Sequence, residues 1–429
     1  MKLLRTAGRG AGKAAEVIAA LERRGGTSLE GVLPAVRRII ADVRREGDRA
    51  LLRYAKRFDG LADAKALRVS QDEMADAWDA ASPELREALT TAAKQIRGFA
   101  ERQLPKDWSA EPAAGLKTGQ LVRPIPSVGC YVPSGRHPLP STLLMTAIPA
   151  QVAGVERVVA VSPKPARETL AAAHLLGIRE FYRVGGAHAI AALAYGTESL
   201  PRVDKIVGPG SLYVTAAKRE VAFDCAIDML AGPTEIAVTS ERGSAVDIAS
   251  DMVAQAEHDS EALAIFITTR EPLAQAVLTE TKLRAKNNTV ARESLRRNGF
   301  VILAANKDEA REITNRIAPE HLTVDAASDL AWVQNAGSVF VGKWSAQPLG
   351  DYISGPNHTL PTGAMARVRG GLSVNDFVKL ITVQEYGNEA IDELGPKAVL
   401  LAEAEGLSAH AEAVRVRLCG ASRGRRKNG

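Results

Sequence analysis

Four separate segments of the 429-residue sequence place a histidine near a carboxylate or an amide. They pair Gln255 with His258, Glu320 with His321, Asp351 with His358, and Glu405 with His410. The whole chain contains seven histidines, so these segments hold most of them. Imidazole, carboxylate and amide groups bind divalent metals, and the first two also transfer protons. The sequence therefore predicts that the four segments converge on one site, with a metal site as the favoured form.

Gln255 and His258 are three residues apart in a segment predicted to be helical from residue 245 to 257, so both side chains project from one face. With Asp351 and His410 from distant segments they would form a mixed nitrogen and oxygen shell. Such a shell suits zinc or, less selectively, manganese or cobalt. The alternative for the helical pair is an ordinary hydrogen bond on a surface or in a core.

Glu320 and His321 follow Pro319 and come immediately before a predicted strand. An adjacent acid and base in such a loop can serve two proton transfers in one reaction cycle, although a chance pair is the alternative. The stretch from residue 350 to 362, which carries Asp351 and His358, mixes glycines and prolines. These residues predict a loop, and a loop on a rigid scaffold often carries chemistry, but an ordinary surface turn has the same composition.

Three glycine-containing loops adjoin predicted strands, at residues 184–188, 207–211 and 231–235. The first two open helices, where backbone N–H groups and the helix dipole favour phosphate. None of them is the dinucleotide fingerprint Gly-x-Gly-x-x-Gly, so a nucleotide site is indicated only weakly. Tyr131, at the end of its predicted strand, could stack on or hydrogen-bond a cofactor, or could be an ordinary strand residue.

The elements that must position these residues follow an α/β pattern. Residues 28–103 are predicted to be helical, with Leu33, Val36 and Ile40 on one apolar face. From residue 121 to 341 strand-like runs alternate with helical segments, which predicts parallel sheets with helical crossovers and enough strands for two sheets. Beyond Leu372 the chain is predicted to be mainly helical and too small to bury a core alone, so we expect it to pack on something else, such as a second subunit.

Composition narrows the class of protein. The net charge of +5 comes mostly from four basic residues within the last seven, so the body of the chain offers little for nucleic acid. Three scattered cysteines without a Cys-x-x-Cys pair argue against a disulfide framework and fit a reducing cytoplasm. No signal-peptide pattern and no run of about 18 apolar residues is present, so we expect no membrane span.

The order of these segments closely resembles the histidinol dehydrogenase family. The resemblance covers residues 28–417, and its matching blocks are 131–133, 138–142, 185–187, 189–197, 203–210, 227–229, 231–233, 255–258, 319–322, 354–358 and 370–374. It implies a zinc-dependent homodimer in the cytoplasm that oxidises L-histidinol to L-histidine through L-histidinal with two NAD+, the last step of histidine biosynthesis. It also implies two Rossmann-like parallel-sheet domains with helical N- and C-terminal extensions.

By matching positions, the resemblance implies roles for twelve residues. Zinc would be bound by Gln255, His258, Asp351 and His410, and Glu320 and His321 would be the acid/base pair. Thr234, His358 and Glu405 would contact substrate, together with the zinc ligands and the acid/base pair. Glu405 and His410 would come from the partner subunit. NAD would meet Tyr131, His188 and Ser211.

The expected domains are an extension over residues 1–27, a first Rossmann-like domain from 28–125 and 236–372, a second from 126–235, and a helical dimerisation segment with a basic tail over 373–429. Two NAD positions depart from the family pattern. His188 stands where glutamine is expected, and Ser211 stands where asparagine is expected, so we predict weakened NAD binding with intact chemistry. The alternatives are a related zinc- and NAD-dependent oxidoreductase for another amino- or sulfo-alcohol, and a zinc-bound protein with weak catalysis.

Overall fold

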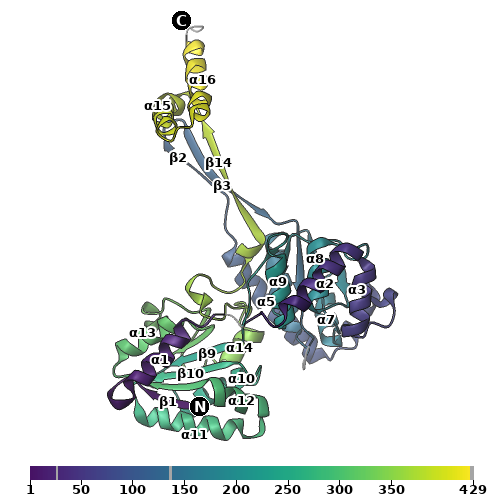
Figure 1. Cartoon of the computed structure of the whole chain (residues 1–429), viewed down its shortest axis with the longest axis vertical. Coiled ribbons are helices and arrows are strands. Elements are labelled where there is room, and N and C mark those ends of the chain that lie inside the picture. The colour runs from purple at the N-terminus through teal and green to yellow at the C-terminus, as the bar shows by residue number, and fades with distance from the viewer. Residues whose placement is uncertain (26–27, 135–137, 426–429) are drawn as a thin grey trace. The chain divides into compact units, whose positions relative to one another are not determined.

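The computed structural model describes residues 1–25, 28–134 and 138–425 (Figure 1). Two compact units are present, one from residues 1–103 and 125–377 and the other from residues 104–124 and 378–429. Within the described residues, no helix is both long and apolar enough to cross a membrane.

A six-stranded, fully parallel sheet lies in the first unit, in the order β1-β11-β10-β9-β12-β13. Its strands are β1 (Lys2–Arg5), β9 (Glu235–Thr239), β10 (Leu263–Thr268), β11 (Gly299–Leu303), β12 (His321–Val324) and β13 (Ser338–Val341). Its helices are α1 (Ala11–Glu22), α10 (Ala245–Ala256), α11 (Glu271–Arg284), α12 (Thr289–Asn298), α13 (Lys307–Ile317) and α14 (Gln347–Tyr352).

Successive side chains along the strands of the six-stranded sheet pack into two different hydrophobic cores. Ile236 and Val238 pack with residues of α10, α11 and α12, whereas Ala237 packs with residues of α1 and α13 (Figure 1). From β9 the chain adds β10 and β11 on one side, and it then adds β12 and β13 on the other. The order of the strands therefore reverses between β9 and β12, which are hydrogen-bonded neighbours.

A second parallel sheet, of five strands in the order β6-β5-β4-β7-β8, completes the first unit. Its strands are β4 (Ser127–Tyr131), β5 (Arg157–Val161), β6 (Glu180–Tyr182), β7 (Lys205–Val207) and β8 (Ala226–Ile227). Its own helices are α6 (Pro140–Ala153), α7 (Arg167–Leu175), α8 (Gly186–Tyr195) and α9 (Leu212–Val221).

Four N-terminal helices pack around this five-stranded sheet: α2 (Leu33–Glu46), α3 (Asp48–Tyr54), α4 (Gln71–Asp79) and α5 (Pro83–Gln103). The predicted apolar face of α2 is confirmed, because Val36 and Ile40 are buried in a core shared with α8 and α9.

The second unit combines an antiparallel sheet with a helix pair. Strands β2 (Trp108–Ala113), β3 (Leu116–Pro124) and β14 (Val378–Tyr386) form the sheet, and α15 (Asn388–Ala404) packs against α16 (Ser408–Arg425). Gly395 permits the close contact of the two helices, since a Cβ there would lie 3.0 Å from the Leu418 side chain. Its buried apolar residues are few: Ala390, Val399 and Ala411 within its described part.

The α/β architecture with two parallel sheets is confirmed, but two of the expected domain assignments are wrong. Residues 1–27 are not a separate extension, because β1 adds an edge strand to the six-stranded sheet. The helices of residues 28–103 pack on the five-stranded sheet, not on the six-stranded one. The C-terminal segment is mainly helical, as predicted, although strand β14 precedes its two long helices. Its predicted basic tail reaches residues 426–429, outside the described residues.

Candidate active site

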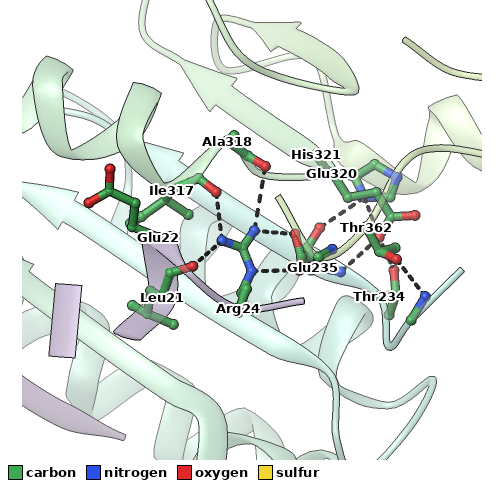
Figure 2. A network of polar contacts seen from close by, with 12 residues as sticks. Leu21, Glu22, Arg24, Thr234, Glu235, Ile317, Ala318, Glu320, His321 and Thr362 are labelled. Carbon is green, nitrogen blue, oxygen red and sulfur yellow. Dashed lines mark hydrogen bonds and ion pairs between the residues drawn. The ribbon is translucent and has the colours of Figure 1, made fainter. Parts of the chain in front are cut away.

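Glu320 and His321 lie where α13 gives way to β12, at the amino end of that strand. Ala318 ends α13 in a left-handed conformation (φ 49°), Pro319 follows, and the strand begins at His321. The neighbouring strand β9 begins at Glu235, and His321 pairs in register with Ile236. The amino ends of two adjacent strands thus bring Thr234, Glu320 and His321 together (Figure 2).

The Glu320 carboxylate is buried and accepts two hydrogen bonds. Its Oε2 accepts one hydrogen bond from the Thr234 hydroxyl at 2.6 Å and another from the Glu235 backbone N–H at 2.7 Å. Burial raises the pKa of Glu320 to about 7, although the nearby His321 imidazole and these two donors oppose the rise. A carboxyl group with that pKa can both lose and regain a proton near neutral pH.

The His321 imidazole is buried and held from both sides. Its Nδ1 lies 3.0 Å from the backbone oxygen of Glu235, and its Nε2 lies 3.7 Å from Asp351 Oδ1. A carbonyl oxygen only accepts, so Nδ1 carries the hydrogen and the neutral ring presents its lone pair at Nε2. Burial opposes protonation, but the charges of Glu320 and Asp351 outweigh it and raise the pKa of His321. The ring is therefore poised as a proton acceptor.

Asp351 and His358 face the same cavity as His321. The cavity has a volume of about 370 Å³ and is also lined by Phe340, Trp344 and Asn357. Burial works to raise the pKa of Asp351, but His321, His358 and His258 outweigh it and the pKa is lowered. His358 donates from Nδ1 to the Asp351 backbone oxygen at 2.8 Å, and burial lowers its pKa. Its neutral ring leaves Nε2 free to accept a hydrogen bond or bind a ligand.

The stretch that carries Asp351 was predicted to be a loop, and its first part is helical instead. Helix α14 runs to Tyr352, and a proline in its first turn favours that start. The helix that carries Gln255 is also shorter than predicted, because α10 ends at Ala256 and His258 lies beyond it. Both boundaries fall within the range where helix ends fray.

Gln255 supplies the observation that tests a metal site. Its Nε2 donates to the Thr234 hydroxyl, while its buried Oε1 has no hydrogen-bond partner among the described residues. A buried polar atom without a partner is costly and calls for a ligand. The exposed His258 imidazole lies near enough to lower the pKa of Asp351. An amide oxygen, an imidazole and a carboxylate fit zinc, although the described residues contain no cluster of three His, Cys, Asp or Glu with metal-binding geometry.

The five-stranded sheet presents its glycine loops at the carboxyl ends of its strands. Tyr131 ends β4, and Gly208 follows β7 with φ 110°, where a Cβ would lie only 2.2 Å from the Tyr131 backbone oxygen. The predicted openings of α8 and α9 by the first two glycine loops are confirmed. Ser211 precedes α9 and is exposed, and its side chain does not cap the helix. Backbone N–H groups at two helix starts near a strand-order reversal fit a dinucleotide.

The His188 side chain is buried and does not lie open to a ligand. The ring is 1% exposed and its Nε2 donates to Asp59 Oδ2 at 2.7 Å. The same carboxylate oxygen accepts the Gly185 N–H at 3.0 Å, and Tyr131 Oη accepts the Gly186 N–H at 3.1 Å. His188 therefore helps to fix the glycine loop through Asp59, which ends a short π-helical turn (Ala55–Asp59).

Comparisons with known proteins agree with this geometry. The family model for histidinol dehydrogenase matches residues 22–418. A relative of that name from Bacillus thuringiensis subsp. konkukian is 45% identical over 399 residues, covering 90% of this chain and 93% of its own. The chain belongs to the histidinol dehydrogenase family.

Two further members of the histidinol dehydrogenase family are similar to this chain over nearly its whole length. The relative from Methanothermobacter thermautotrophicus is 44% identical over 414 residues, covering 94% of this chain and 97% of its own. The crystal structure of the Elizabethkingia anophelis enzyme superposes with a TM-score of 0.91 at 35% identity, covering 98% of both chains. Family membership makes this chain an oxidoreductase of histidine biosynthesis.

Two residues implied by the family resemblance, Glu405 and His410, belong to the second unit. Glu405 follows the end of α15, His410 lies in the first turns of α16, and both are exposed. Their contribution to the site from a partner subunit stays a prediction.

Three residues that shape the candidate sites are not predicted as site residues by the sequence: Arg24, Asp59 and Glu235. Arg24 binds the Glu235 carboxylate, and Glu235 bonds both Glu320 and His321 through its backbone (Figure 2). The adjacency of Glu235 to Thr234 was a usable signal. Nothing local marks Arg24 or Asp59, because each acts on residues more than 120 positions away.

Proposed function

We propose that this protein oxidises L-histidinol to L-histidine through L-histidinal, using two NAD+ and one zinc ion per subunit, in the last step of histidine biosynthesis. The observation that carries the proposal is the buried Glu320–His321 pair at one end of adjacent strands, beside a cavity that Asp351 and His358 also line. This arrangement offers one proton acceptor for an alcohol and a second for water.

His321 is the base of the first oxidation. Its Nε2 takes the hydroxyl proton of histidinol while a hydride leaves the same carbon for NAD+, giving the aldehyde and NADH. The hydrogen bond from Nδ1 to the Glu235 carbonyl keeps the lone pair at Nε2 and fixes the plane of the ring. The nearby carboxylates stabilise the imidazolium that forms.

Glu320 is the base of the second half-reaction. It takes a proton from a water molecule as that water attacks the aldehyde, giving the monoanion of a gem-diol. A second hydride then passes to a second NAD+ and a proton is lost, which leaves the carboxylate of histidine. The pKa of about 7 suits a group that accepts a proton and must release it again. Keeping the aldehyde bound through both steps avoids release of a reactive intermediate.

Zinc would be bound by Gln255, His258 and Asp351, with His410 of the partner subunit as a fourth ligand. The unpartnered Gln255 amide oxygen supports this assignment. The bound ion would supply a Lewis-acidic anchor for the imidazole and amine of the substrate. Thr234, His358 and Glu405 would contact the substrate, and Thr234 is already oriented by its hydrogen bond to Glu320.

A homodimer fits the surface of the second unit. Large apolar side chains there are exposed, including Leu380, Leu400 and Leu401, the last two at 67% each, while few apolar residues are buried. A second copy of the chain would cover them. The free, buried thiols of Cys130 and Cys225 fit the reducing cytoplasm.

The test is the stoichiometry of NADH formation by the zinc-loaded protein with limiting L-histidinol, followed to completion over a range of NAD+ concentrations. We expect two NADH per histidinol, and we expect a chelator to abolish turnover and added zinc to restore it. Neighbouring amino alcohols serve as controls and should give little NADH. Absence of NADH at saturating NAD+ from folded, zinc-loaded dimer would contradict the proposal.

A further inference from the structure

Both catalytic side chains are held by the backbone of one residue, Glu235. Its N–H donates to Glu320 Oε2 at 2.7 Å, and its carbonyl oxygen accepts from His321 Nδ1 at 3.0 Å. A small movement of this peptide would therefore shift the carboxylate and turn the imidazole together. Glu235 is itself 4% exposed, so its position depends on what its own side chain contacts.

The Glu235 side chain is fixed by a guanidinium from the far end of the sequence. Arg24, just past α1, donates from Nε to Oε1 at 2.7 Å and from Nη2 to Oε2 at 2.5 Å (Figure 2). The Gly363 N–H donates to Oε1 at 2.9 Å. A bidentate fork of this kind fixes both the distance and the plane of the carboxylate, which a lysine cannot do.

Arg24 also holds the chain segment that leads into Glu320. Its Nη1 donates to the Ile317 oxygen at 2.6 Å, and its Nη2 approaches the Ala318 oxygen at 3.4 Å. Ala318 is left-handed (φ 49°) although it has a Cβ and precedes proline, so this turn is strained and needs external support. Ala364, the other non-glycine residue with positive φ in the described chain, packs against Ala318 and follows Gly363.

We propose that Arg24 is a positioning residue for catalysis. It ties the start of β9 to the turn before β12, and so sets where Glu320 and His321 stand relative to each other. A buried ion pair by itself adds little stability. Here one guanidinium donates to both segments that carry the reacting groups, as well as to the Leu21 oxygen of α1. The role of Arg24 in turnover rests on the proposed function, but its role in geometry does not.

The first experiment compares Arg24→Gln and Arg24→Lys with the wild-type holoenzyme. We expect Arg24→Gln to lower kcat by about 10- to 100-fold, with the KM for NAD+ within about 2-fold, because the substrate and cofactor contacts remain while the reacting groups shift. Arg24→Lys should fall between the two, since one ammonium cannot replace a fork. An unchanged kcat in folded Arg24→Gln would overturn the proposal.

A matched control separates positioning from simple loss of an ion pair. Arg157 forms a similar bidentate pair with Glu180, with both contacts at 2.7 Å, on the five-stranded sheet and away from the dyad. Arg157→Gln should leave kcat within about 2-fold at temperatures below its own melting transition. An equal fall of kcat in both variants would show a general effect of destabilisation and would contradict the proposal.

A double-mutant cycle tests whether Arg24 acts through Glu235. Glu235→Gln keeps the backbone contacts to the dyad but loses the charged fork. If the two residues act as one unit, the double variant should be about as slow as the slower single variant. Losses of kcat that multiply would show independent roles and would overturn the proposed route.

A readout without turnover distinguishes failure of this proposal from failure of the proposed function. In protein labelled with ¹⁵N-histidine, the His321 imidazole nitrogens, assigned by comparison with His321→Asn, report the hydrogen bond to Glu235. We expect Arg24→Gln to shift the Nδ1 resonance and Arg157→Gln to leave it in place. An unshifted resonance in Arg24→Gln would contradict the proposal even if the protein proved inactive toward histidinol.

Discussion

The two parallel sheets of the first unit present their polar residues from opposite strand ends. In the five-stranded sheet, Tyr131 and Gly208 follow the carboxyl ends of β4 and β7, where the strand order reverses and open α/β sheets usually bind ligands. In the six-stranded sheet, Glu320 and His321 stand at the amino end of β12, beside the amino end of β9. The architecture therefore does not decide by itself which end carries the chemistry.

The carboxyl ends of β9 and β12 carry a different set of polar groups. There Asp325 accepts the Ser240 hydroxyl at 2.5 Å and the Glu241 N–H at 2.7 Å, so the polar groups satisfy one another. At the amino ends, Gln255 Oε1 is unpartnered and His321 lines a cavity. Each end faces a cavity, of about 370 Å³ at the amino ends and about 290 Å³ at the carboxyl ends, and the amino ends differ in that His321, Asp351 and His358 line theirs.

The proposed functional end of each sheet contains a buried ion pair whose side chains also hydrogen-bond to the backbone. Arg24 and Glu235 hold the catalytic pair, while Lys218 and Asp228 hold the glycine loop. Lys218 Nζ donates to the Gly208 oxygen at 3.1 Å, and Asp228 Oδ2 accepts the Gly208 N–H at 2.8 Å. The two ion pairs differ in what they hold: the proposed reacting side chains in one sheet, and the backbone of the proposed NAD site in the other.

The largest effect is expected at the amino ends. His321→Asn removes the proton acceptor of the alcohol but keeps a polar side chain, so kcat should fall by about 100- to 10,000-fold. Steady-state NADH formation measures the loss, and circular dichroism with thermal melting checks the fold. If the variant kept at least a tenth of the wild-type kcat, His321 would not be the proton acceptor. The comparison between the two sheets would then fail.

The Lys218–Asp228 ion pair of the five-stranded sheet should contribute mainly to the free energy of unfolding. Lys218→Met leaves the Asp228 carboxylate buried without its cation, which should cost about 3–5 kcal/mol in the free energy of unfolding. Urea titration measures this change. Adding Asp228→Asn should recover much of the loss, because no uncompensated charge then remains; a double variant no more stable than Lys218→Met would contradict the explanation.

The carboxyl ends of β9 and β12 should matter for stability alone. Asp325→Asn leaves one acceptor in place of two and should lower the free energy of unfolding by about 1–3 kcal/mol. We expect kcat to stay within about 2-fold of wild type under conditions where the variant is fully folded. A large fall in kcat would mean that this end takes part in the reaction.

The smallest effect concerns the two unusual residues of the glycine loops. Changing His188→Gln together with Ser211→Asn should lower the KM for NAD+ by a few-fold, about the worth of one or two hydrogen bonds. His188 is already hydrogen-bonded to Asp59, whereas Ser211 is exposed and does not cap α9. Ser211→Asn alone should therefore give most of the decrease in the KM for NAD+. A KM unaffected by the double change would contradict the predicted weakening.

Local patterns in the sequence predicted much of the fold and the residue types of the site. The apolar period of α2 and the alternation of strands and helices were sufficient, since each is a short-range signal. Strand β1 escaped because it has four residues and pairs with β11 almost 300 positions away. Strand β14 is exposed along almost its whole length and so shows no alternation.

The site was predicted as a set of residue types and not as a network. Glu320, His321 and Asp351 were found because histidine and carboxylate are adjacent or close in the chain, and the structure brings them together. Arg24 could not be found, since its role depends on long-range contacts.

The central claim is that the amino ends of β9 and β12 carry two separate proton acceptors, one for each half-reaction. The most direct test supplies Glu320→Gln with L-histidinol and, separately, with L-histidinal, and measures NADH formation from each across pH 6 to 8. The ionised fraction of Glu320 rises with pH through its pKa of about 7, so wild-type oxidation of histidinal should rise over this range.

We predict that Glu320→Gln loses at least about 100-fold in histidinal oxidation, loses that rise with pH, and retains more of the first oxidation. The yield from histidinol should then fall from two NADH toward one. Two NADH per histidinol at the wild-type rate, with an unchanged pH profile, would contradict the account.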